Sequence, residues 1–169
     1  MRVFLIGFMA SGKSSVGKKL ANKIGLPFVD LDDYIEEKYK TTIRLLIYDM
    51  GMDKFREIEK ESLETIIKEN EDILVSTGGG TPVFFDNMKL MNNSGVTIYL
   101  EVDIPTLVDR LMYAKKDRPL IWGKTKEDLT VYAKDLLDRR KDDYLKAKHT
   151  INGKNLKMED LTNLLKIKA

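Results

Sequence analysis

The sequence predicts a three-layer α/β/α protein, in which a five-stranded parallel sheet lies between two layers of helices. Short apolar runs alternate with longer stretches of helical spacing, and this alternation is typical of a parallel sheet. The first run, residues 3–6, is apolar at every position, as expected of a strand that is buried on both faces. A glycine-containing loop follows it, and Val16, Leu20 and Ile24 then recur at the spacing of one helical face.

The remaining elements follow from the same two patterns and from turn residues. Strands are expected at 3–6, 26–29, 73–76, 96–100 and 149–151. Helices are expected from the loop to Ile24 and at 33–40, 42–49, 54–69, 84–92, 105–112 and 127–146, with a last one from Lys157. Gly25 ends the first helix, and Pro105 begins the sixth.

Composition restricts the function. The 29 Lys and Arg nearly balance the 27 Asp and Glu, so the net charge of +2 argues against a general nucleic-acid surface. With no Cys and one His, thiol chemistry, disulfides and multi-His metal sites are excluded. No apolar run is long enough for a membrane span or a signal peptide. We expect one cytoplasmic domain, residues 1–169, with no nucleic-acid or membrane partner.

Residues 7–14 fit the phosphate-binding pattern G-x-x-x-x-G-K-[ST]. The pattern stands between a strand and a helix, which is the context it requires. We expect the loop and the start of the helix to bind ATP through Ala10, Ser11, Gly12, Lys13, Ser14 and Ser15. Lys13 supplies a positive charge to the β- and γ-phosphates, and the Ser14 hydroxyl is a ligand for Mg²⁺.

Polar residues follow the second and third strands. Asp30 and Asp32 come after the second strand, and three glycines, residues 78–80, come after the third. Because ligands bind beyond the carboxyl ends of the strands in such sheets, these residues are expected to face one site with the phosphate loop. Asp30 could instead cap the next helix, and the two roles could coexist. Asp32 could be only a solvated first-turn carboxylate.

Taken together, these motifs resemble the shikimate kinase family, which has a P-loop kinase fold of the nucleoside-monophosphate-kinase type. The matching stretches are residues 7–14, 30–32, 55–59, 77–80 and 118–120, and Arg140 four residues before Tyr144. The phosphate loop alone occurs in many families, whereas the ordered set is specific. The resemblance implies that ATP phosphorylates the 3-hydroxyl of shikimate, on the route to chorismate and the aromatic amino acids.

The resemblance also implies roles for single residues. Asp30 and Ser14 are similar to residues that hold the Mg²⁺ shell, and Asp32 is similar to a residue that orients or deprotonates the substrate hydroxyl. Arg56 and Arg140, with the backbone N–H of Gly79, are expected to hold the substrate carboxylate, for which a guanidinium is well shaped. Glu59 is expected to pair with Arg56. Arg139 adjoins Arg140, and either could point inward; the spacing to Tyr144 favours Arg140.

Three further regions are implied. Residues 31–69 are expected to form the substrate-binding helical region, and residues 113–126 a lid over ATP. Arg118 in this lid resembles a catalytic Arg that reaches the ATP phosphates, and Trp122 lies four residues after it. Arg110 is expected to lie near the adenine.

Two other interpretations of the motifs are open. The chain could be another small-molecule kinase of the same fold, such as a gluconate or nucleoside monophosphate kinase, although Arg56, Gly79 and Arg140 suit a carboxylate. It could also be a catalytically silent nucleotide-binding regulator, against which the intact Lys13, Ser14 and Asp30 argue. We expect a monomer with shikimate and ATP as its small-molecule partners.

Overall fold

A computed structural model describes residues 1–114 and 123–166 of the 169-residue chain. In this part, five parallel strands form a sheet in the order β2-β3-β1-β4-β5. The strands are β1 (Arg2–Ile6), β2 (Phe28–Asp30), β3 (Ile73–Ser76), β4 (Val96–Glu101) and β5 (His149–Asn152). The predicted α/β fold with a five-stranded parallel sheet is therefore confirmed.

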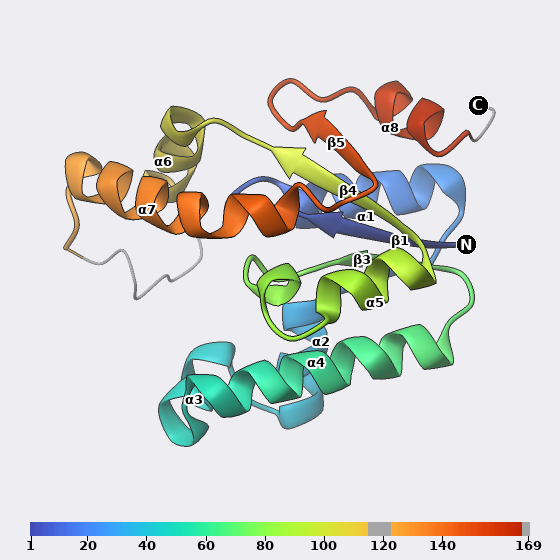
Figure 1. The fold of residues 1–169 in the computed structure, drawn as a ribbon, viewed down its shortest axis with the longest axis horizontal. Coiled ribbons are helices and arrows are strands. Elements are labelled where there is room, and N and C mark those ends of the chain that lie inside the picture. The colour runs from blue at the N-terminus through green and yellow to red at the C-terminus, as the bar shows by residue number, and fades with distance from the viewer. Residues whose placement is uncertain (115–122, 167–169) are drawn as a thin grey trace.

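Helices cover both faces of the sheet (Figure 1). They are α1 (Lys13–Ile24), α2 (Leu31–Tyr39), α3 (Ile43–Met50), α4 (Met52–Glu69), α5 (Asn87–Ser94), α6 (Ile104–Met112), α7 (Lys126–Tyr144) and α8 (Met158–Leu164), with a 3₁₀ turn η1 (Thr81–Val83). Helices α1 and α8 lie on one face, and α4 and α5 lie on the other, as Figure 1 shows. In the described residues, no helix combines the length and the apolar character that a membrane span requires.

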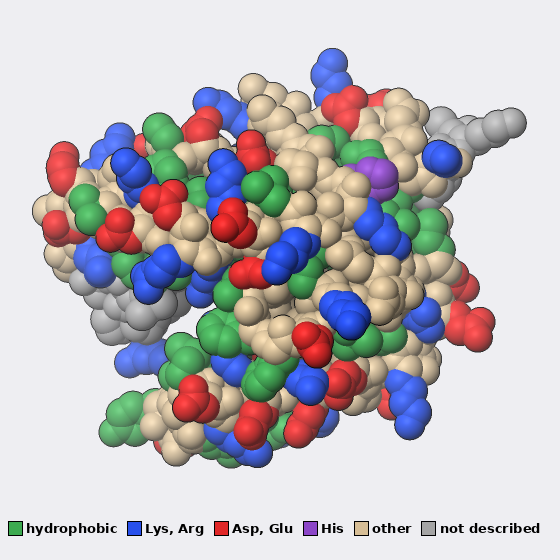
Figure 2. Space-filling model, viewed as in Figure 1, with side chains coloured by type: hydrophobic (Ala, Val, Ile, Leu, Met, Phe, Trp, Pro, Cys, Tyr) green, Lys and Arg blue, Asp and Glu red, His purple; other side chains and the backbone are tan. Residues whose placement is uncertain are grey.

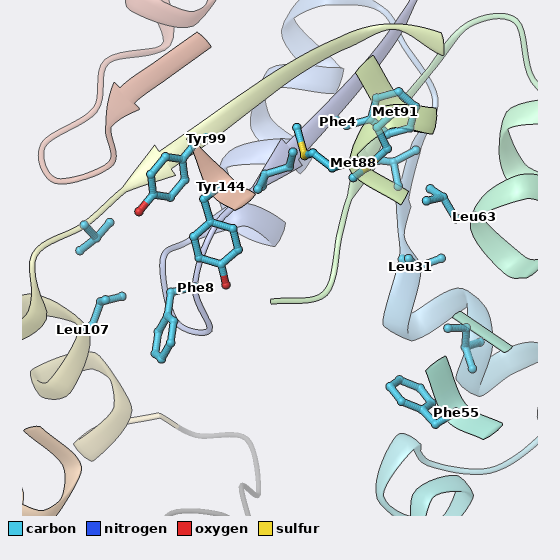
Figure 3. Close-up of a cluster of buried hydrophobic side chains, with 14 of the residues drawn as sticks. Phe4, Phe8, Leu31, Phe55, Leu63, Met88, Met91, Tyr99, Leu107 and Tyr144 are labelled. Atoms are coloured by element: carbon cyan, nitrogen blue, oxygen red, sulfur yellow. The ribbon is translucent and has the colours of Figure 1, made fainter. Parts of the chain in front are cut away.

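Strand β1 shows why both faces need cover. Val3 and Leu5 point into the core beneath α1 and α8, whereas Phe4 and Ile6 point into the larger core on the other face. All four side chains are fully buried. The larger core carries the aromatic side chains drawn in Figure 3, where Tyr144 of α7 lies between Tyr99 of β4 and Phe8 of the phosphate loop.

Two elements begin at least two residues later than the sequence predicts. The second strand begins at Phe28 instead of residue 26, because the Leu26 N–H donates to the Ala21 carbonyl and so closes the end of α1. The helix predicted at 84–92 begins at Asn87. The η1 turn and the positive φ of Phe85, 50°, come before it, so the chain cannot enter a helix at residue 84.

Candidate active site

The loop between β1 and α1 depends on glycine at two positions. A Cβ on Gly7 would lie 2.8 Å from Oγ of Ser11 and 2.9 Å from the carbonyl of Leu100. Gly12 has a φ of 92°, in the left-handed region that side chains disfavour, and it immediately precedes α1. Ala10 also has a positive φ, 63°. Such alternation of backbone conformation turns successive N–H groups toward one concavity, which suits an anion.

Lys13 lies inside this loop and is 8% exposed. Its ammonium donates to the carbonyls of Gly7 and Phe8, at 2.7 and 2.9 Å, and to the hydroxyl of Ser11 at 3.4 Å. The loop therefore holds a positive charge at its centre, where phosphate oxygens would be received.

Asp30 ends β2 and uses its two carboxylate oxygens for different purposes. Oδ1 accepts hydrogen bonds from the N–H groups of Asp32 and Asp33, at 3.1 and 3.3 Å, and so caps α2. Oδ2 accepts a hydrogen bond from the hydroxyl of Ser14 at the start of α1. The cap that the sequence offered as an alternative is thus present beside a second, separate contact.

The Ser14 and Asp30 pair is a suitable partial site for Mg²⁺. In the described residues, no group of three or more His, Cys, Asp or Glu side chains could hold a metal. Mg²⁺ in kinases takes one or two protein oxygens and completes its octahedron with water and nucleotide phosphates. One hydroxyl and one carboxylate oxygen beside the phosphate loop meet this requirement, and Ser76 adds a hydroxyl 3.3 Å from that of Ser14.

Asp32 lies in the first turn of α2 and is half-buried. Burial, and to a smaller extent the carboxylates of Asp30 and Glu59, raise its pKa to about 6, against the opposing effect of the Lys13 ammonium. The cause is desolvation, which disfavours the charged form. A carboxylate with this pKa is ionised at neutral pH and is a better proton acceptor than an exposed aspartate.

Arg56 of α4 is held by Glu59, as the sequence predicted. Its Nη1 lies 2.9 Å from Oε1 of Glu59, with the two side chains 11% and 1% exposed. The ring of Phe84 lies 4.2 Å from the guanidinium carbon. A Cβ on Gly80 would lie only 2.5 Å from Nη2 of Arg56, so the guanidinium is packed directly against this glycine.

Arg140 reaches the same turn from α7. Its Nη1 would lie 3.3 Å from a Cβ on Gly79, whereas the neighbouring Arg139 is exposed and donates to the carbonyl of Asp135. Tyr144, one helical turn later and fully buried, donates a 2.6 Å hydrogen bond to the Gly79 carbonyl. The choice of Arg140 over Arg139 as the inward residue agrees with this geometry.

Tyr144 also shows that the two arginines lie near each other. Burial raises the pKa of its hydroxyl, and the charges of Arg140 and Arg56 both oppose this shift. Both guanidinium groups, from α7 and α4, therefore lie near enough to this hydroxyl for their charge to act on it, and they lie against the adjacent glycines Gly79 and Gly80. Figure 2 shows the surface hollowed between the lobes that carry these elements.

Of the other residues predicted to bind ATP, the structure describes Arg110 and Ser15 but not Arg118. Arg110 of α6 donates to the carbonyl of Ala10 at 3.2 Å, so it lies against the phosphate loop. Ser15 is exposed in the first turn of α1. Arg118 and Trp122, with most of the predicted lid, lie outside the described residues.

The site is continuous from the phosphate loop to the triple glycine, because a Cβ on Gly79 would lie 3.4 Å from the backbone N of Met9. The phosphate loop thus adjoins two guanidinium groups, and Asp32 lies within the electrostatic influence of both Lys13 and Glu59, which is the partner of Arg56. Such a site can bind a nucleotide and a second anion side by side. Sequence reasoning missed Thr81 and Phe84, for which the only signal was their place just after the triple glycine.

Comparisons with known proteins agree with this geometry. The shikimate kinase family model matches residues 9–167. A shikimate kinase from Parabacteroides distasonis is 43% identical over 168 residues, which cover 97% of this chain and 96% of that protein. The crystal structure of shikimate kinase from Bacteroides thetaiotaomicron has a TM-score of 0.95 at 37% identity, over 99% of each chain. A shikimate kinase from Acinetobacter baumannii in complex with shikimate has a TM-score of 0.84 at 29% identity, over 97% of this chain and 89% of that one. The chain therefore belongs to the shikimate kinase family.

Proposed function

We propose that this protein transfers the γ-phosphoryl group of ATP to the 3-hydroxyl of shikimate, giving shikimate 3-phosphate and ADP, on the route to chorismate and the aromatic amino acids. The observation that carries the proposal is the convergence of Arg56 and Arg140 on adjacent glycines beside the phosphate loop. Two guanidinium groups form a strong, planar receptor for a carboxylate. The Gly79 N–H is the proposed third donor to this group.

On the nucleotide side, the backbone of residues 10–15 and the N-terminus of α1 receive the phosphates. Lys13 exchanges its carbonyl partners for phosphate oxygens and stabilises the charge that develops during transfer. Arg110, fixed on the loop backbone, lies on the nucleotide side of the site. The proposed contact of Arg118 with the phosphates rests on the sequence resemblance.

Ser14 and Asp30 are the residues that would hold Mg²⁺, since their oxygens already meet. When bound, the ion neutralises charge on the β- and γ-phosphates. Asp30 remains the cap of α2 throughout, because that role uses its other oxygen.

Asp32 is the proposed acceptor of the substrate proton. As the oxygen of the 3-hydroxyl forms its bond to the γ-phosphorus, the bond between the γ-phosphorus and the oxygen that bridges the β- and γ-phosphates breaks, and ADP leaves. The hydroxyl proton passes to the Asp32 carboxylate, whose pKa of about 6 keeps it ionised at neutral pH. Since the transition state is loose, orientation of the hydroxyl by Asp32 contributes alongside proton transfer.

We further propose that the enzyme works as a monomer in the cytoplasm, where ATP is supplied. Arg56, Gly79 and Arg140 all come from one chain, so the carboxylate receptor needs no second copy. The net charge of +2 argues against nucleic acid as a partner, and we propose no membrane partner either.

A coupled ADP-release assay tests the proposal. With ATP and Mg²⁺, we expect rapid turnover of shikimate and none above background for gluconate or AMP, which are the acceptors of the alternative kinases. Background rates with shikimate and clear turnover of either alternative would reject the assignment. Nucleotide binding without turnover of any acceptor would favour the silent regulator.

A further inference from the structure

Behind Arg56 lies a chain of buried polar groups that runs from α4 into the η1 turn. Glu59 is 1% exposed, and its two carboxylate oxygens have different partners. Oε1 accepts from Nη1 of Arg56 at 2.9 Å, and Oε2 accepts from the hydroxyl of Thr81 at 2.8 Å. Because a buried carboxylate needs a partner for each oxygen, Thr81 completes the ion pair.

Thr81 is itself fixed by other elements. It is fully buried, its N–H donates to the carbonyl of Gly78 at 3.2 Å, and its carbonyl accepts from Nδ2 of Asn87 at 2.9 Å. The triple glycine and α5 therefore set the position of the Thr81 hydroxyl. It cannot simply follow Glu59 if that side chain rotates.

This arrangement determines how Glu59 can hold Arg56. A guanidinium and a carboxylate commonly pair through two parallel hydrogen bonds. Here the pair has one hydrogen bond, since Arg56 donates to one oxygen of Glu59 and Thr81 donates to the other. In the described part of the chain, Nε of Arg56 is buried and has no hydrogen-bond partner, so this guanidinium is not saturated by its carboxylate. Phe84 covers its face without using a donor.

We propose that Thr81 is a positioning residue for substrate recognition. Its hydroxyl donates to Oε2 of Glu59 and so prevents Glu59 from forming a bidentate pair with Arg56. A bidentate pair would use N–H donors of Arg56 that are needed for the substrate carboxylate. Thr81 itself touches no substrate. The inference rests on the proposed function, since it requires that Arg56 binds the carboxylate of shikimate.

Calorimetric titration of shikimate without nucleotide tests this role, together with steady-state kinetics of the same variants. Thr81→Val has nearly the same shape but lacks the hydroxyl, and we expect about tenfold weaker binding, which corresponds to the loss of about one hydrogen bond to a charged group. KM for shikimate should rise by a similar factor, with kcat and KM for ATP within about twofold of wild type. Thr81→Ser should restore wild-type values.

Thr97→Val is the matched control. Thr97 of β4 is also fully buried, donates to Oδ1 of Asn92 at 2.5 Å and accepts from the N–H of Lys148 at 2.8 Å. We expect this variant to lose thermal stability and to keep its affinity for shikimate. A purely structural Thr81 would behave in the same way, so wild-type affinity in Thr81→Val overturns the inference, and so does a Thr81→Ser variant that fails to restore binding.

Failure of the proposed role of Thr81 can be distinguished from misfolding of a variant and from failure of the proposed function. If Thr81→Val does not fold, Thr81→Ala carries the same test, because it removes the hydroxyl without placing a methyl group against the carboxylate. If the wild-type protein neither binds nor phosphorylates shikimate, the proposed function fails. Normal wild-type activity with Thr81 variants of unchanged affinity rejects only the role of Thr81.

Discussion

The hydroxyl of Ser14 donates a hydrogen bond to Oδ2 of Asp30, so the first residues of α1 and the end of β2 meet at one point. The other oxygen of the same carboxylate caps α2. One side chain thus supports the substrate-side helix and faces the proposed metal position. These two duties belong to different atoms, and substitutions can therefore separate them.

Asp30→Asn is expected to keep the cap and lose the metal. Asn caps helices as well as Asp, so the free energy of unfolding in urea should change by less than about 0.5 kcal/mol. Asp30→Ala should lose about 1 kcal/mol, because the N–H groups of Asp32 and Asp33 lose their acceptor. Both variants should need much more Mg²⁺ for half-maximal ADP release. Equal Mg²⁺ requirements in Asp30→Asn and wild type would restrict Asp30 to capping.

Arg140 and Arg139 form a natural comparison, because they are adjacent in α7 but point in different directions. Arg140→Ala should weaken shikimate binding by about 2 kcal/mol or more, since truncation of one partner leaves a desolvated carboxylate short of donors. Arg139→Ala should leave it unchanged, because this side chain is exposed. Titration calorimetry with shikimate, and separately with an ATP analogue, measures both. Similar losses for the two ligands in Arg140→Ala would contradict a carboxylate-specific role.

Gly80→Ala tests the position of Arg56 by steric means. The φ of Gly80 is −92° and its ψ is −14°, a conformation open to alanine, so backbone strain does not arise. The new methyl group would meet the guanidinium of Arg56 at 2.5 to 2.7 Å. We expect a folded protein in which Arg56 is displaced and shikimate binds at least tenfold more weakly.

A double-mutant cycle isolates this effect. In the Arg56→Ala background, Gly80→Ala should cost little further affinity for shikimate, because the guanidinium that the methyl group displaces is gone. Additive losses in the cycle would mean that Gly80 acts on binding independently of Arg56.

The fold could be read from the sequence because its determinants are local. The apolar run of β1 and the phosphate-binding pattern of the loop after it each lie in consecutive residues. Gly25 ends α1 because its own φ of 70° is left-handed, a conformation that glycine adopts readily. The start of β2 was misplaced because the role of the Leu26 N–H depends on the preceding helix. The η1 turn was missed because no regular spacing accompanies three residues.

The candidate site could be read less completely, since its contacts join distant residues. The pairing of Arg56 with Glu59 followed from helical spacing. The contact of Tyr144 with Gly79 spans 65 positions, and that of Thr81 with Glu59 depends on how the η1 turn meets α4. No periodicity encodes such approaches, so only the folded structure supplies them.

Asp32 gives a prediction for pH dependence. With a pKa of about 6, its carboxylate must lose a proton before it can accept one from the substrate, so kcat/KM for shikimate should fall below about pH 6. The γ-phosphate of ATP titrates in a similar range, and Asp32→Asn is the control for this contribution. Asp32→Asn should have a much lower kcat, and the pH profile of its kcat/KM should show only the change caused by titration of the γ-phosphate of ATP.

The same shift predicts the sign of a stability change. Because the pKa of Asp32 is higher in the folded protein than the ordinary 3.8, the protonated form stabilises the fold below about pH 4, and this contribution is lost as the pH rises through about 6. Asp32→Asn mimics the protonated carboxyl, so at pH 8 it should be more stable than wild type in urea, by at most about 3 kcal/mol. The difference should vanish near pH 4. An Asp32→Asn variant that is less stable than wild type at pH 8 would contradict this, because it would mean that the folded state favours the ionised carboxylate. If the variant is more stable but has lost its activity, the charge of Asp32 serves catalysis and destabilises the fold.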